Sequence, residues 1–193
     1  MTRSIDAMPL EEAILGRRAV RAYTLETIDQ PTLRSLLEAA VWAPTAMHHE
    51  PWQFIILQDR NLLKHLSDRA KSLFSAEAKD LHQNHGSLDL FSQPDFNVFY
   101  DAGTLVVVCA KSASSFVFAD CWLAAENLML SAHAKGLGTC VIGLAVSALN
   151  MPDVKQELGI PSETIAVAPI IVGKPRGDVP PSSRHEPQII VWV

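Results

Sequence analysis

The segment 119–135 is the part of the sequence that most constrains the fold. It reads ADCWLAAENLMLSAHAK, is rich in alanine and leucine, and contains no glycine or proline. Such a composition favours a helix, and apolar side chains cover most of its circumference. Gly136 and Gly138 follow and are expected to end it. Because a helix that is apolar on most sides is expected to be buried, this segment is expected to lie inside the fold.

Five apolar runs predict strands. Thr104–Ala110 (TLVVVCA) is rich in β-branched residues and is the expected central strand. Trp52–Leu57 (WQFIIL) is expected to be a buried strand. Shorter or later strands are predicted at Thr139–Ile142, Thr164–Val172 and Gln188–Val193. Strands and helices alternate irregularly, which predicts an α+β or α/β sheet flanked by helices.

Apolar residues at helical spacing predict four further helices. A polar stretch containing Gly86 and Pro94, His85–Asn97, predicts a loop. No strand is followed by a GxGxxG sequence, so a Rossmann dinucleotide site has no support. The length of 193 residues, without repeats or a flexible linker, predicts a single domain over 1–193. The predicted helices are Pro9–Gly16, a helix starting near Pro31 and ending near Trp42, Asn61 to about His82, and Asp153–Leu158.

Composition excludes several classes of protein. A net charge of −5 argues against a nucleic-acid binder, which is usually basic. The longest apolar run, Leu105–Ala110, is far shorter than the roughly 20 residues that span a bilayer. The N-terminal segment lacks the apolar core of a signal peptide. The cysteines are odd in number and form no CxxC pair, so we expect neither disulfides nor a zinc site, and a reducing cytoplasm. They are Cys109, Cys121 and Cys140.

Three arginines stand within five residues of this acidic chain, in the segment Arg17–Arg21 (RRAVR). Guanidinium groups make forked, charge-assisted hydrogen bonds to phosphate. The segment also follows a predicted helix, where cations interact favourably with the helix dipole. It therefore predicts either a phosphate site or a solvated helix end.

A second segment, 43–52 (APTAMHHEPW), connects a helix to a strand. Its small, hydroxyl and imidazole groups between two prolines could lie against a flat ligand, or form an exposed polar turn. His48, His49 and Glu50 could also be metal ligands, but adjacent residues rarely converge on one ion.

A third segment is 136–143 (GLGTCVIG). Its glycines allow either close approach of the backbone to a ligand or a tight turn from helix to strand. Cys140 is a weak candidate nucleophile, and a buried structural thiol is the commoner case. Near the C-terminus, Arg184 in PPSSR is either a second phosphate contact or a lone surface arginine.

The order and spacing of these segments resemble the nitroreductase family over nearly the whole chain. The family pattern comprises an RRSVR-like start, an APSxxNxQPW-like loop, an apolar strand, an Ala-rich helix ending in GLGTCxIG, and a late arginine. This chain supplies RRAVRAY, APTAMHHEPWQF, TLVVVCA, AAENLMLSAHAKGLGTCVIG and PPSSR. The resemblance implies an α+β fold whose central, mostly antiparallel sheet is flanked by helices.

The resemblance also implies a flavoprotein that binds FMN at the interface of a homodimer and oxidises NADH or NADPH. Hydride would pass through flavin N5 to nitroaromatics, quinones or similar flat acceptors by a ping-pong mechanism, with no catalytic side chain. The three arginines and Arg184 would hold the phosphate and ribityl region, 44–46 would reach the flavin from the other subunit, and 142–143 would lie near the ring. The implied cofactor-binding residues are Arg17, Arg18, Ala19, Arg21, Pro44, Thr45, Ala46, His48, Ile142, Gly143 and Arg184.

Three residues depart from the family pattern. Ala19 replaces a serine, His48 an asparagine, and Glu50 a glutamine. His48 can still donate or accept a hydrogen bond, whereas Glu50 brings negative charge unless it is paired or protonated. We expect these changes to alter the choice of acceptor more than the binding of FMN.

Other functions are also compatible with the sequence. Reductive dehalogenation or flavin fragmentation could run on the same fold, and a flavin-storage module would bind FMN without consuming NAD(P)H. The apolar tail Pro187–Val193 (PQIIVWV) needs a cover, because a free apolar strand promotes aggregation. It is either exchanged with a second subunit, as the family implies, or an edge strand of its own sheet.

Overall fold

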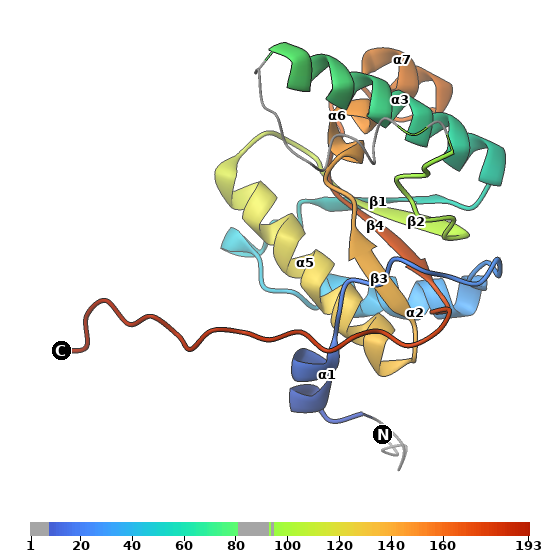
Figure 1. Ribbon diagram of the computed structural model, residues 1–193. Helices are drawn as coiled ribbons and strands as arrows, with labels where there is room; N and C mark the ends of the chain where they lie inside the picture. The colour runs from blue at the N-terminus through green and yellow to red at the C-terminus, as the bar shows by residue number, and fades with distance from the viewer. Residues whose placement is uncertain (1–7, 81–92, 94) are drawn as a thin grey trace.

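The computed structural model describes residues 8–80, 93 and 95–193 (Figure 1). A four-stranded sheet with the order β1-β2-β4-β3 lies at its centre. All three neighbouring pairs are antiparallel, which confirms the predicted α+β class and the mostly antiparallel sheet. The strands are β1 (Trp52–Leu57), β2 (Thr104–Ala110), β3 (Gly138–Val141) and β4 (Ile165–Gly173).

Helices cover both faces of this sheet (Figure 1). One face carries α3 (Arg60–Asp80), α6 (Ala145–Leu149) and α7 (Pro152–Glu157). The other carries α2 (Gln30–Val41) and α5 (Ser115–Ala134), and α1 (Leu10–Gly16) lies beside α5. Each interface between sheet and helices contains one of the two apolar clusters of the core.

The central position of β2 is confirmed, since all seven of its residues are buried. Successive side chains of a strand point to opposite faces. Leu105 and Val107 accordingly pack with the α3 side, whereas Val106 and Val108 pack with α2 and α5. A strand covered on both faces can be continuously apolar, which explains the sequence TLVVVCA.

The prediction that Trp52–Leu57 is a buried strand is wrong in part. The strand forms with the predicted bounds, but Trp52 alone is buried, and Gln53 and Ile56 are exposed. It pairs with β2 on one side only and so forms an edge of the sheet. An edge strand lies partly beyond the helices that cover the sheet, so its apolar residues keep contact with solvent.

The end of α5 agrees with the prediction and has a clear physical cause. Gly136 adopts the left-handed conformation with φ of 73°, which costs glycine little. Its N–H donates to the carbonyl of His133, and the N–H of Leu137 donates to that of Ala132, both at 2.9 Å. This is a Schellman motif, which satisfies carbonyls that the helix leaves free.

The rest of α5 differs from the prediction in two respects. The helix begins at Ser115, four residues before the predicted start at Ala119. It is also not buried all round, because Phe116, Trp122 and Leu123 are exposed in the single chain. One side packs on the sheet and on α2, and the other presents apolar side chains outward.

The other predicted helices are present as α1, α2, α3 and α7. Asp29 begins α2, since its carboxylate accepts a hydrogen bond from the N–H of Thr32 at 2.8 Å and another from the hydroxyl of Thr32 at 2.9 Å. These two hydrogen bonds lower the pKa of Asp29. Helix α6 was not predicted, since five residues are too few to show a helical period. The expected end of α3 at His82 and most of the expected loop lie outside the described residues.

The predicted final strand at Gln188–Val193 does not form in the single chain. The tail extends away from the sheet (Figure 1), and Ile190 and Trp192 are 96% and 86% exposed. A strand needs a neighbouring edge with which to pair, and residues 188–193 pair with no strand of the described part of the chain. None of the helices in the described ranges has the length and hydropathy to cross a bilayer.

Candidate functional site

The arginine segment leaves α1 and runs alongside β3. Ala19 pairs with Thr139 in a parallel bridge, and the N–H of Val20 donates to the carbonyl of Thr139 at 2.9 Å. Because the two backbones run in the same direction, Arg17 lies toward the start of β3 and Arg21 toward its end. The segment 142–143 follows directly after that end, so two of the four predicted segments meet at one edge of the sheet.

Arg17 and Arg18 have different surroundings. The Nε of Arg17 lies 3.2 Å from Oε1 of Glu126 on α5. Arg18 donates to the carbonyls of Leu15 and Arg17 at 2.6 and 2.7 Å, and so also stabilises the end of α1. Its Nε, however, is buried and has no hydrogen-bond partner. A buried donor without an acceptor is costly, so this segment has unused capacity for an anionic acceptor.

Arg21 lies next to the thiol of Cys140. Burial raises the pKa of this thiol, while the nearby guanidinium groups of Arg21 and Arg17 act in the opposite direction. Cys140 is only 4% exposed, and its Sγ contacts the carbonyl of Val141. These surroundings favour a structural thiol over a nucleophile.

The glycines of the segment 136–143 serve different purposes. A side chain at Gly138 would place its Cβ 2.7 Å from Cβ of Val20, so this glycine permits the arginine segment to approach β3. Gly143 is exposed, and open space surrounds the position of a Cβ there. The neighbouring Ile142 is buried, and its N–H already donates to Pro169 at 2.8 Å. Gly136 also faces open space, but its positive φ serves the turn that ends α5. Gly143 is therefore the glycine beyond that turn with room for a ligand.

The loop after α2 is anchored to α5. The short helix η1 (Ala46–His48) follows Pro44 and Thr45, and the N–H of Ala46 lies 3.2 Å from both carboxylate oxygens of Asp120. Asp120 and Glu126 are six residues apart, or about 9 Å along the helix axis. One helix thus holds both this loop and the arginine segment.

The backbone of this loop is strained. Met47, His48 and Glu50 have φ values of 57°, 55° and 44°, a region in which residues other than glycine are rare. Each such residue costs on the order of 1–3 kcal/mol and tends to occur at functional sites. All three side chains are exposed, so none is retained for packing within the chain.

The remaining predicted features are not brought to the arginine segment. Arg184 lies in the exposed tail, where it donates to Ser182 and Ser183, and no hydrogen bond joins it to 17–21 among the described residues. The metal alternative has no geometric support, since no group of three His, Cys, Asp or Glu side chains converges in the described ranges.

Two residues that the sequence did not single out, Asp120 and Glu126, are also candidates for a functional role. They are the only charged residues within α5, a helix that is otherwise apolar or neutral. That isolation was a usable signal, because a charge placed in a buried helix requires a partner.

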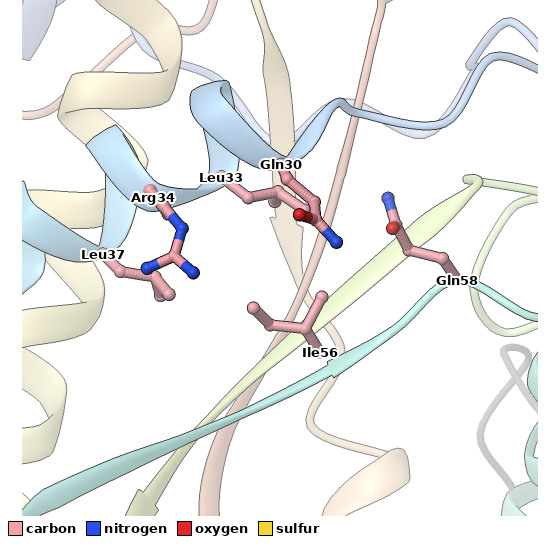
Figure 2. A pocket seen from close by; sticks show the side chains of 6 residues that line it. All are labelled: Gln30, Leu33, Arg34, Leu37, Ile56 and Gln58. Atoms are coloured by element: carbon pink, nitrogen blue, oxygen red, sulfur yellow. The ribbon is translucent and has the colours of Figure 1, made fainter.

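A pocket of about 390 Å³ opens at the opposite edge of the sheet, between α2 and β1 (Figure 2). Arg34 and Gln30 of α2 face Ile56 of β1 and the following Gln58 across this space. Gln58 is held by hydrogen bonds to the carbonyl of Ile28 and to Oγ1 of Thr104. None of the predicted cofactor-binding residues lines this pocket.

Comparison with known proteins agrees with this geometry. A protein of Archaeoglobus fulgidus assigned by name as an NADH dehydrogenase/NAD(P)H nitroreductase is 27% identical, over 86% of this chain and 84% of its own. An iodotyrosine deiodinase of Thermotoga neapolitana is 24% identical, over 88% and 90%. The solved structure of a Bacteroides fragilis nitroreductase with bound FMN is 28% identical, covers 95% of this chain and 98% of its own, and superposes with a TM-score of 0.80.

The sequence model of the Nitroreductase family matches residues 14–174. The match begins in α1, just before the arginine segment, and extends to the end of β4, so it includes every predicted segment except that of Arg184. The protein therefore belongs to the nitroreductase family.

Proposed function

We propose that this protein is an FMN-dependent oxidoreductase that oxidises NADH or NADPH and reduces nitroaromatics, quinones or similar flat acceptors. The observation that carries the proposal is the arginine segment, where the Nε of Arg18 is buried without an acceptor beside Arg17 and Arg21. The FMN-bound relative from Bacteroides fragilis and the NAD(P)H nitroreductase relative support the choice of cofactor and reductant.

The residues present fit FMN. Three guanidinium groups supply forked donors for the phosphate and ribityl oxygens, which are the acceptors that such a group binds best. Ala19 contributes backbone only, and Arg184 would complete the phosphate site through movement of the tail or from a second chain. The open space at Gly143 would admit the edge of the ring system.

When bound, FMN supplies the two-electron chemistry, accepting hydride at N5 and passing electrons to the second substrate in a separate half-reaction. The protein's part is to bind, orient and polarise. Gly143 would present its backbone N–H toward the ring, and the segment 44–46 with His48 would line the opposite side. The electron transfer is carried out by the flavin, and the protons that the acceptor takes up can come from solvent, so we assign no catalytic residue.

We further propose a homodimer with one FMN-binding domain per chain. The tail Pro187–Val193 is apolar and exposed, and so are Phe116 and Trp122 on α5. The outer edge of β1 is unpaired in the four-stranded sheet, and Leu33, Leu37 and Ile56 line the pocket beside it. A tail from a second copy could bury these surfaces, pairing as an added strand.

Reductive dehalogenation is the second candidate, favoured by the iodotyrosine deiodinase relative from Thermotoga neapolitana. It would use the same cofactor residues with a halogenated aromatic substrate. Anaerobic assays with reduced enzyme distinguish the two activities. A dehalogenase releases halide from iodotyrosine, whereas a nitroreductase reduces nitroaromatics and releases no halide.

The decisive experiment is an absorption spectrum of the purified protein, followed by anaerobic titration with NADH or NADPH. We expect flavin absorption that is bleached by either nucleotide and restored by a quinone or a nitroaromatic compound. A protein that remains colourless after addition of FMN would contradict the proposal. Flavin that binds but is never bleached would indicate a storage module instead.

A further inference from the structure

Asp120 is the only charged residue among the buried side chains of the described chain, and it is only 5% exposed. Burial of a carboxylate is costly unless it is paired. No Lys, Arg or His forms a salt bridge with it in the described ranges. Within the described residues its carboxylate accepts from the N–H of Ala46, which both oxygens share.

The position of Asp120 on its helix does not explain the charge. It is the sixth residue of α5, in the second turn. The interaction of a carboxylate with the helix dipole is largely confined to the first turn. An uncharged residue at this position would pack without the cost of desolvation, so the benefit of Asp120 lies in what it holds.

What it holds is one end of the strained loop. Ala46 directly precedes Met47 and His48, which have left-handed backbones. The other end is held by Lys111, whose Nζ donates to the carbonyl of Glu50 at 3.1 Å. Strained residues persist only when their surroundings fix them. These two tethers, from α5 and from the end of β2, bracket the strained residues.

We propose that Asp120 is a positioning residue, which fixes the Thr45–Ala46 peptide and thereby the shape in which the loop contacts the cofactor. The nature of that cofactor, FMN, rests on the proposed function, whereas the anchoring of Ala46 does not.

The test compares two substitutions of Asp120 with a control on the same helix. Asp120→Ala removes the acceptor, whereas Asp120→Asn keeps an amide oxygen that can accept the same N–H. The control is Asn127→Ala, which removes a different bond from α5, between Nδ2 and the carbonyl of Ala39 at 3.2 Å. Amide hydrogen exchange at Ala46 measures the anchoring, and the rate of FMN release from the holoprotein, followed by flavin fluorescence, measures its consequence.

We expect Asp120→Ala to raise both the exchange rate at Ala46 and the rate of FMN release by about tenfold or more, because one charge-assisted hydrogen bond is lost. Asp120→Asn should stay within about threefold of the parent protein. Asn127→Ala should leave both rates nearly unchanged. A purely structural role predicts instead that Asp120→Ala and Asn127→Ala lower the melting temperature without a selective effect on Ala46.

Unchanged exchange at Ala46 in Asp120→Ala would overturn the proposal, and so would faster exchange with unchanged FMN release. If the parent protein binds no FMN, the proposed function fails. The exchange measurement then still decides whether Asp120 anchors the loop.

Discussion

The Nε of Arg17 lies 3.2 Å from Oε1 of Glu126, so a side chain expected to hold phosphate already pairs with a carboxylate of α5. Glu126 is nearly half exposed, and solvent-exposed ion pairs contribute at most about 1 kcal/mol. A phosphate carries more charge and more acceptor oxygens. It can therefore draw the guanidinium away from Glu126, or share it, at little cost.

This relationship predicts opposite effects for the two partners. Arg17→Ala should weaken FMN binding by roughly 10- to 100-fold, the loss of one or more charge-assisted hydrogen bonds. Glu126→Gln should leave FMN affinity unchanged or strengthen it, because the guanidinium is released. Fluorescence titration with FMN at low and high salt measures the affinity of both variants. Arg69→Ala is the matched control, since it removes an arginine that pairs with Asp153 far from this segment. Equal weakening by Arg17→Ala and Arg69→Ala would indicate a general charge effect.

Arg18 provides a second prediction, based on its unpaired buried Nε. In Arg18→Ala the cost of that orphan donor disappears, so the flavin-free protein should lose little stability. The rise in melting temperature on adding FMN should shrink, because the acceptor that FMN brings is no longer used. Differential scanning fluorimetry with and without FMN measures the two quantities. An unchanged FMN-induced shift would remove Arg18 from the site.

The exposed tail predicts that the oligomeric state depends on its apolar residues. Truncation after Glu186, or the pair Ile190→Asp and Trp192→Asp, should convert a dimer to monomers or aggregates, because apolar surface loses its cover. Sedimentation velocity measures the mass. Val179→Asp, which changes an exposed apolar residue nearer the domain, serves as the control. A truncated protein that remains a dimer and keeps the parent's FMN content would contradict the exchange of the tail.

The loop residues that depart from the family pattern predict a change in specificity. His48→Asn with Glu50→Gln restores the amides of that pattern and removes one negative charge. Because both side chains are exposed, stability should change by less than about 0.5 kcal/mol. We expect the ratio of kcat/KM between anionic and neutral acceptors to rise severalfold, while the affinity for FMN stays within about threefold. An altered FMN affinity with an unchanged acceptor ratio would show that these two residues act on FMN binding and not on the choice of acceptor.

The buried thiols predict a loss of stability at alkaline pH. Burial, with a smaller effect of Cys121, raises the pKa of Cys109 to about 12, and burial with the nearby Asp120 raises that of Cys121 to about 11. In the unfolded chain these thiols ionise near pH 9, whereas the folded protein keeps them protonated. Their contribution is therefore complete below about pH 9 and is lost as the pH rises through 11 to 12.

Urea unfolding midpoints measured from neutral to alkaline pH test this sign. The midpoint should fall more steeply in the parent protein than in Cys109→Ala, even if that variant is less stable throughout. Both thiols should also resist alkylation in the folded protein and react once it is unfolded, because the thiolate is the reactive form. Parallel pH profiles for the two proteins would contradict the assignment.

Much of the fold could be predicted because it depends on local patterns. The run of seven apolar residues in β2 required cover on both faces, and Gly136 ended α5 through its left-handed backbone. The glycines of the segment 136–143 could be located but not explained. That Gly138 accommodates Val20 whereas Gly143 faces open space depends on a chain segment more than 100 residues away.

The sequence by itself determined the type of most elements, their sidedness and the order of motifs that identifies the family. The tertiary structure decided that β1 is an edge, that the tail pairs with no strand of the described chain, and that α5 holds both the loop and the arginine segment. The reason is physical. Periodicity and turn chemistry act over a few residues, whereas the contacts of Arg17 with Glu126 and of Ala46 with Asp120 join positions 109 and 74 residues apart. Contacts of that kind exist only once the sheet and its helices have packed.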